Sequence, residues 1–373
     1  MHTLNVQEKY YNMLKSGTKT IELRLFDEKR QAVKIGDMIE FTNASDTDDK
    51  FVAEVVNLHR ADDFEALCQK IDCRKAGFKT NEELIKCLAE FYTSQKQKQF
   101  GVLGIEIKKM HLKIIFANVI QGMIHIGYNE KKENLFDGFH PEKYVAYFAK
   151  EEPDILCMAE CLFDTPEGKS AFVKDIAKQC GLPYYKNLVG EKAFFVKDKY
   201  YGLSICSKFP IEDYEVLKLA NPQIKTIRPN GEHWVMHDKY IQKVGLRFGS
   251  DIKIQLINTH MFPFQHFNKH FWDAEFAVYR KQWAEMLIPN ERKSVLVGDF
   301  NTVGISIDKA FPELEIGQKL QSLVTYDGKK YQPVYLYDTQ IEYILATKDF
   351  KLLSAKEEML YSDHPFLIAE VDL

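Results

Sequence analysis

The sequence predicts a two-domain α+β protein, with a small mixed domain first and a larger layered domain after it. The chain has 373 residues, and domains of roughly 100–200 residues make two the natural number. With 45% hydrophobic and 28% charged residues, the composition is globular and excludes a disordered or fibrous chain. Beyond residue 110, strand-like segments outnumber the helical ones, which favours a β-sandwich flanked by helices over a doubly wound parallel sheet.

The first domain, residues 1–108, is predicted to be a small mixed β-barrel or curled sheet with helices. A helix over residues 7–16 should end at Gly17, a residue suited to a C-terminal helix cap. The turn-rich stretch 43–50, NASDTDDK, predicts a hairpin loop. The remaining predicted elements are strands 20–26, 38–43, 51–60 and 101–109 and helices 61–71 and 80–92, the last capped by Thr80 or Asn81.

The domain boundary is predicted near Lys108–Met110, without a Gly-, Ser- or Pro-rich linker, so the second domain spans residues 112–373. Three helices are predicted there: 141–152, with Pro141 in its first turn, 168–181, ended by Gly181, and an aromatic-rich helix over 266–287. The predicted strands are 114–119, 154–160, 202–208, 241–249, 252–260, 294–301, 341–347 and 366–373.

Charge and cysteine content narrow the classes of partner. Residues 1–110 carry 18 Lys and Arg against 18 Asp and Glu, and the rest carries 32 against 36. Neither part has the basic excess that holds long duplexes, so a nucleotide, a short oligomer or a small phosphodiester is a better ligand. The lack of a long apolar stretch and the polar first residues predict a cytoplasmic protein without a membrane partner. Seven cysteines without a CxxC pair indicate reduced thiols.

Polar residues stand repeatedly at the ends of apolar strands in the second domain. They are Asn118, Glu160, His260, Asp299 with Asn301, and the pair Asp363–His364 before the last strand. Such a pattern assembles a polar site at one rim of a sheet. Carboxylate and amide oxygens suit a hard cation such as Mg²⁺, and two histidines can serve proton transfer and charge stabilisation at phosphorus.

Residues 111–373 resemble the endonuclease/exonuclease/phosphatase superfamily, which includes type I deoxyribonuclease, neutral sphingomyelinase and the AP endonucleases. The resemblance implies a four-layered α/β sandwich with a Mg²⁺- or Mn²⁺-dependent site at one rim. The matching segments, in chain order, are NVIQG (118–122), PDILCMAE (153–160), YYGLSICSKFPI (200–211), INTHM (257–261), VGDFN (297–301), IEYIL (341–345) and SDH (362–364).

The resemblance also implies which residues act on metal and water. Glu160 would be the main Mg²⁺ ligand, with Asn118 and Asp363 close to the metal. Asp299 and Asn301 would hold the attacking water and the scissile phosphate.

Further implied roles concern the histidines and a tyrosine. His364 would be the base or the transition-state stabiliser, and His260 the second histidine of the deoxyribonuclease and sphingomyelinase branches. Tyr200 stands where AP endonucleases keep a phosphate-binding tyrosine. Glu342 occupies the place of an Asp that orients the last histidine, and Asp338 is an alternative partner.

The first domain resembles the ASCH family, a PUA-like β-barrel linked to RNA. The resemblance rests on GTKTIELR (17–24), which fits G-x-K-x-x-E-x-R, on IGDMIEF (35–41) and on FGVLGIEI (100–107). It implies that Lys19, Glu22 and Arg24 bind RNA or a modified nucleotide. From spacing alone, the three side chains could equally pair with one another. Some small ASCH proteins hydrolyse N4-acetylcytidine, but Glu22 replaces their nucleophilic Thr, which favours recognition.

Two histidine pairs, His233/His237 and His266/His270, have the i,i+4 spacing of ligands on a helix and raise a weaker zinc alternative. We therefore predict a divalent-metal-dependent phosphodiesterase or nuclease that acts on nucleic acid or a nucleotide derivative. An RNA-binding protein and an acetylcytidine amidohydrolase run by the first domain are the alternatives. The sequence leaves the substrate and the oligomeric state open.

Overall fold

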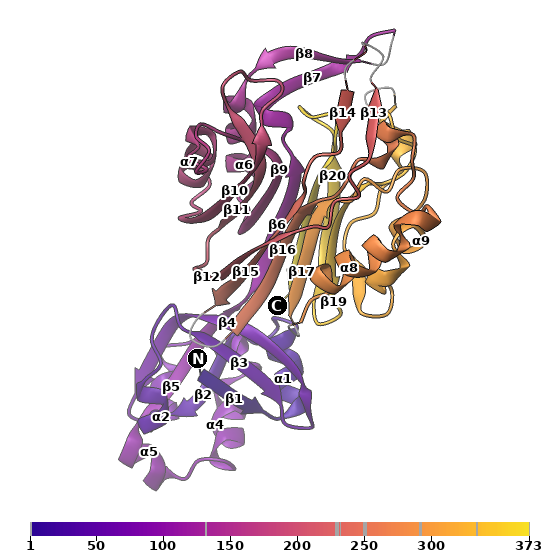
Figure 1. Ribbon diagram of the computed structural model, residues 1–373. Coiled ribbons are helices and arrows are strands. Elements are labelled where there is room, and N and C mark those ends of the chain that lie inside the picture. Colours follow the sequence, from indigo (N-terminus) through magenta and orange to yellow (C-terminus); the bar gives the residue numbers. More distant parts are fainter. Residues whose placement is uncertain are drawn as a thin grey trace. The chain divides into compact units, whose positions relative to one another are not determined.

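The computed structural model describes residues 2–130, 133–227, 231, 233–248, 252–290, 293–332 and 335–372. The chain forms two compact units (Figure 1), one consisting mainly of Met1–His111 and the other of Leu112–Phe248 with Lys253–Val371. None of the helices described in these ranges combines the length and apolar character needed to cross a membrane.

The smaller unit contains a five-stranded mixed sheet in the order β1-β3-β4-β5-β2, in which β1 runs parallel to β3. Because β1 and β2 are the two terminal strands of this order, closure into a barrel stays a prediction. Its elements are β1 (His2–Val6), α1 (Glu8–Lys15), β2 (Ile21–Leu25), α2 (Glu28–Gln31), β3 (Met38–Asn43), β4 (Asp46–Ala61), α3 (Phe64–Cys68), η1 (Cys73–Ala76), α4 (Asn81–Ala89), α5 (Ser94–Phe100) and β5 (Val102–Lys109).

Local signals explain much of this unit, and three expectations need correction. The Thr80 side chain accepts a hydrogen bond from the Glu83 backbone N–H and caps α4, as the sequence predicts. Strand β1 and helix α5 are absent from the predicted elements, because β1 has only two apolar residues, Leu4 and Val6, and α5 is polar apart from Phe100. The predicted hairpin loop is mostly strand, since β4 already begins at Asp46.

The larger unit is built on two six-stranded sheets. The first has the order β10 (Tyr184–Lys192), β11 (Tyr200–Ser207), β9 (Ile155–Phe163), β6 (His111–Asn118), β21 (Phe366–Asp372) and β20 (Lys351–Glu358). The second has the order β12 (Ile211–Lys218), β15 (Tyr240–Phe248), β16 (Ile252–His260), β17 (Ser294–Asp299), β19 (Glu342–Thr347) and β18 (Leu320–Ser322). Both sheets mix parallel and antiparallel pairs, as the prediction of a layered sandwich requires.

Helices cover the outer face of each sheet (Figure 1). Helices α6 (Pro141–Glu151) and α7 (Ala171–Gln179) pack through Tyr144, Phe148 and Phe172 on the core of the first sheet. Helix α8 (Ala277–Leu287), with α9 (Ile307–Ala310), packs on the second sheet around Trp283. Apolar side chains on one face of each helix drive this arrangement, because their burial removes apolar surface from water.

The inner faces of the two sheets pack against each other, and one buried amide bridges them. Asn258 of β16 donates from Nδ2 to the carbonyl oxygens of Met158 in β9 and Ser204 in β11, both at 3.3 Å. These hydrogen bonds, with the one from Gln242 Nε2 of β15 to the Lys186 carbonyl of β10, tie the two sheets together in one alignment.

Two hairpins and several short helical turns complete the unit. The predicted helix around residues 266–287 is α8 preceded by two 3-10 turns, so His266 and His270 do not share a helix. His233 begins strand β14 and His237 follows it, so neither pair has helical geometry. The elements are η2 (Ile120–Gly122), β7 (Met123–Tyr128), β8 (Asn134–Phe139), β13 (Lys225–Ile227), β14 (His233–Val235), η3 (Phe264–Phe267), η4 (Ala274–Phe276), η5 (Pro312–Leu314) and η6 (Gly328–Tyr331).

Candidate active site

Strand register brings most of the predicted residues to one rim of the larger unit. Strands β16 and β17 are parallel and pair His260 with Asp299. Strand β19 is antiparallel to β17 and pairs Glu342 with Asp299. In the first sheet, parallel β6 and β9 place Asn118 beside Ala159, the residue before Glu160.

Asn118 joins the two halves of this rim. Its Nδ2 donates to Glu160 Oε1 at 3.3 Å and to Asp299 Oδ2 at 3.4 Å, and its Oδ1 accepts from the Ile120 backbone N–H at 3.1 Å. The resemblance to the endonuclease/exonuclease/phosphatase superfamily implies that Asn118 lies close to the metal. As placed, Asn118 gives N–H groups rather than an oxygen to the carboxylates, so it orients them.

Two residues of the rim have left-handed backbone conformations. Glu160 has φ +50° inside β9, where the pairing with β11 shifts register, and Asn301 has φ +52° just after β17. Such conformations cost of order 1–3 kcal/mol in residues other than glycine and concentrate at functional sites. In β9 the bulge redirects the Glu160 carboxylate.

Burial disfavours the ionised form of the carboxylates at the rim. A bound cation would stabilise that ionised form. Burial raises the pKa of Glu160, although His364 opposes that shift. Burial likewise raises the pKa of Asp299 to about 7 against the effect of His364. With Asp363 they form a set of hard oxygen donors, and a divalent cation bound there would relieve their repulsion.

His364 forms the centre of a hydrogen-bonded network on the second sheet. Its Nδ1 contacts Glu342 Oε1, and the other oxygen of Glu342 accepts from the Tyr326 hydroxyl. The longer Glu side chain therefore reaches the histidine, as its position suggested. Asp299, Glu342 and His364 also lie close enough together to hold an ion. The direct Glu342–His364 contact favours an acid–histidine pair instead.

The two histidines are held in opposite protonation states. Burial would lower the pKa of His364, but Asp363 and Glu342 outweigh it and keep this pKa well above the usual range. Burial, Lys239 and His364 hold the pKa of His260 well below it. His364 is therefore an imidazolium and His260 a neutral imidazole at neutral pH.

Asn301 is fixed next to Asp299. Its backbone N–H donates to Asp299 Oδ1 at 3.0 Å, and its Nδ2 donates to the Met261 carbonyl at 3.1 Å. Gln265 donates from Nε2 to Asn301 Oδ1 at 2.9 Å. The carboxylate and the amide thus have defined orientations before any ligand binds.

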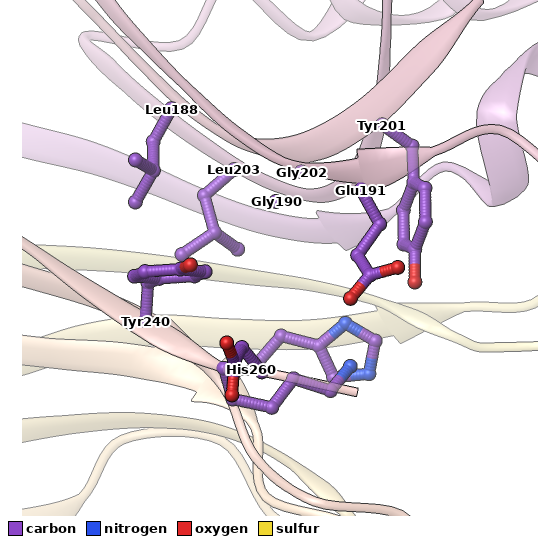
Figure 2. Close-up of a pocket in the computed structure, with 10 residues that line it drawn as sticks. Leu188, Gly190, Glu191, Tyr201, Gly202, Leu203, Tyr240 and His260 are labelled. Carbon is purple, nitrogen blue, oxygen red and sulfur yellow. The ribbon is translucent and has the colours of Figure 1, made fainter. Parts of the chain in front are cut away.

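Tyr200 is the predicted site residue that the structure does not bring to the rim. It packs against the helix-covered core of the first sheet. The next residue, Tyr201, points into a pocket beside His260 together with Glu191 (Figure 2). Because successive strand residues face opposite sides of a sheet, an error of one residue in alignment moves a side chain to the wrong face.

In the smaller unit, Lys19, Glu22 and Arg24 form a largely buried ion-pair triad. Glu22 lies 3.3 Å from Lys19 Nζ and 2.9 Å from Arg24 Nη2. Burial lowers the pKa of Lys19, with Glu22 opposing the shift. The mutual pairing left open by the sequence is therefore present. The triad also lines a cavity of about 130 Å³ together with aromatic residues such as Tyr10 and Tyr92.

The family comparison agrees with this geometry. The Endonuclease/Exonuclease/phosphatase family model matches residues 137–364. The chain belongs to this family. The ASCH domain model matches residues 4–111, which gives the fusion of the two domains that the sequence predicts. No curated protein matches the chain.

The larger unit is similar in fold to a solved structure with a TM-score above 0.5, and two further structures match with lower scores. The endonuclease/exonuclease/phosphatase from Beutenbergia cavernae is 15% identical, covers 71% of this chain and 72% of its own, and has a TM-score of 0.53. The Bacteroides vulgatus endonuclease/exonuclease/phosphatase is 17% identical with a TM-score of 0.47, covering 71% and 100%. ANGEL2, a 2′,3′-cyclic phosphatase in complex with adenosine-2′,3′-vanadate, is 16% identical with a TM-score of 0.46, covering 71% and 96%.

The buried carboxyl of Asp299 should make the stability of this endonuclease/exonuclease/phosphatase domain depend on pH. Its pKa rises from 3.8 to about 7, so folding favours the protonated form. The contribution of the protonated Asp299 carboxyl to folding stability is complete below about pH 4 and is lost as pH rises through about 7. In EDTA, the thermal midpoint of wild type should fall by several degrees between about pH 5 and pH 8.

The Asp299→Asn variant should show a smaller fall over the same pH range in scanning calorimetry. Saturating Mg²⁺ should reduce the fall in wild type, because the cation competes with the proton for the carboxylates. Equal pH profiles for wild type and Asp299→Asn would contradict the assignment.

Proposed function

We propose that the larger unit is a Mg²⁺- or Mn²⁺-dependent phosphodiesterase or nuclease that acts on nucleic acid or a nucleotide derivative. The observation that carries this proposal is the joint presence of three carboxylates and two histidines at one rim. Glu160, Asp299 and Asp363 would hold the cation, which supplies charge neutralisation at the phosphoryl oxygens.

The remaining groups account for an in-line hydrolysis. Asp299 and Asn301 orient a water, whose oxygen forms the new bond to phosphorus while Asp299 takes its proton. His364, as an imidazolium, stabilises the growing negative charge and gives its Nε2 proton to the leaving oxygen as the P–O bond breaks. Glu342 and Tyr326 keep the His364 ring in place through Nδ1.

A metal-supplemented screen tests the proposal. Phosphodiesters and phosphomonoesters, including short RNA and DNA, are incubated with wild type and with Glu160→Ala in Mg²⁺, Mn²⁺ or EDTA. Hydrolysis that requires both the metal and Glu160 supports the proposal. Hydrolysis that continues in EDTA for every active substrate would reject it.

For the smaller unit we propose recognition of RNA or of a modified nucleotide by Lys19, Glu22 and Arg24. A cavity of about 150 Å³ accommodates benzene, so about 130 Å³ suits a single six-membered ring such as a pyrimidine. Recognition is favoured over amide hydrolysis because Glu22 is bound to Lys19 and Arg24 and because the cavity lining does not include Thr20. Acetate release from N4-acetylcytidine would favour the amidohydrolase instead.

Lys19→Met should weaken binding of short RNA by about tenfold or more, because it removes a charge-assisted contact. On an RNA substrate KM should rise, while kcat on a minimal phosphodiester stays nearly unchanged. Lys75→Met, which removes an exposed lysine of the same unit, is the control. Equal RNA affinity in the two variants, measured by calorimetry, would contradict this role.

A further inference from the structure

A small pocket opens beside His260, between β10 and β11 of one sheet and the start of β15 in the other (Figure 2). Its volume is about 30 Å³. One water requires roughly 10–15 Å³ by the same measure, so the pocket admits two or three oxygen atoms. Its lining is Leu188, Gly190, Glu191, Tyr201, Gly202, Leu203, Asp238, Lys239, Tyr240 and His260.

Lys239 is the lysine that lines this pocket. Only 9% of the residue is exposed, and the described residues offer its ammonium neither a hydrogen bond nor an ion pair. The nearby acids are already bound. Asp238 pairs with Lys218, and Glu191 pairs with His237 Nδ1 at 2.7 Å.

Burial makes the charge of Lys239 unfavourable. It lowers the pKa of the ammonium, and the carboxylates of Glu160 and Asp299, followed by Glu191, oppose the shift. A divalent cation on Glu160 and Asp299 would cancel much of that support. The ammonium then needs an anion, because a buried unpaired charge is costly.

We propose that Lys239 binds a non-bridging oxygen of the phosphoryl group and that this pocket is an oxyanion subsite of the active site. The inference rests on the proposed phosphohydrolase function. The volume of the pocket is sufficient for the non-bridging oxygens of a phosphoryl group. Tyr201 adds a neutral donor, since burial raises its pKa and keeps the hydroxyl protonated. His260 forms the side of the pocket that faces the carboxylates.

The test compares Lys239→Met with Lys243→Met in the full-length chain. Lys243 is 8% exposed and lies on the same strand, but it does not line the pocket. Binding of inorganic phosphate is measured by calorimetry with saturating Mg²⁺. Lys239→Met should bind phosphate at least tenfold more weakly than wild type, and Lys243→Met should match wild type. Equal affinity in all three proteins, or no binding of millimolar phosphate by wild type, overturns the subsite.

A measurement on wild type covers the case in which Lys239→Met fails to fold. Acetic anhydride labels lysines, and mass spectrometry gives the rate at each residue. Phosphate with Mg²⁺ should slow labelling of Lys239 at least threefold and leave Lys243 unchanged. Unchanged labelling of Lys239 would overturn the subsite. Metal-dependent hydrolysis that is lost in Glu160→Ala tests the phosphohydrolase separately, so the two failures are distinguishable.

Discussion

Glu160→Gln should lower kcat/KM of metal-dependent phosphoester hydrolysis by about 10³-fold or more. Loss of a ligand that positions the catalytic metal removes several kcal/mol of transition-state stabilisation, and each 1.36 kcal/mol corresponds to a factor of ten. Glutamine keeps the size of the side chain and its amide can still accept from Asn118. The variant therefore isolates the charge.

Stability separates this loss from misfolding. Because burial raises the pKa of Glu160, its ionised form destabilises the metal-free fold. The thermal midpoint of Glu160→Gln in EDTA should therefore equal or exceed that of wild type. Glu370→Gln removes a more exposed carboxylate from the same sheet and should retain full activity. Near-normal hydrolysis by Glu160→Gln would exclude Glu160 as the main ligand.

His364→Gln should reduce kcat by about 10³-fold, with a much smaller change in KM. An imidazolium that donates to developing charge contributes mainly in the transition state, and removal of such a donor costs about 10²–10³-fold or more. Single-turnover hydrolysis of a phosphodiester with an alkoxide leaving group measures the effect on the chemical step.

A substrate with a good leaving group provides the diagnostic contrast. A p-nitrophenyl ester needs no proton on its leaving oxygen, so His364→Gln should lose much less activity on that ester. Glu342→Gln should show the same contrast with a smaller loss, because Glu342 acts through the histidine. His140→Gln, a change at an exposed histidine, serves as the control. Equal losses on both esters would argue against proton donation by His364.

The position of the site could be predicted from the sequence because strand ends in a mixed sheet converge. Asn118, His260 and Asp299 each end a strand, and the register of the parallel pairs then places them at one rim. Glu342 was assigned to His364 from motif position alone, and the structure shows their contact. Asn118, His260 and Asp299 share a signal that is local, namely an apolar strand that ends in a polar group.

Other parts of the site have no local signal. Lys239 precedes an ordinary strand, and its burial beside His260 depends on how the two sheets pack. Tyr326 reaches Glu342 from a loop, which periodicity cannot show. The resemblance points to Tyr200, whereas Tyr201 lines the pocket, because sequence does not say which of two adjacent strand residues faces the inner side. Tertiary packing decides all three.

The order of strands in the first sheet carries a consequence for biosynthesis. Strand β21, which follows Asp363 and His364, lies between β6 and β20, although β6 is the first strand of the larger unit. A nascent chain that has not yet supplied β21 leaves β6 without its neighbour and lacks the last histidine. On the proposed function, hydrolytic activity then begins only when translation has passed this segment.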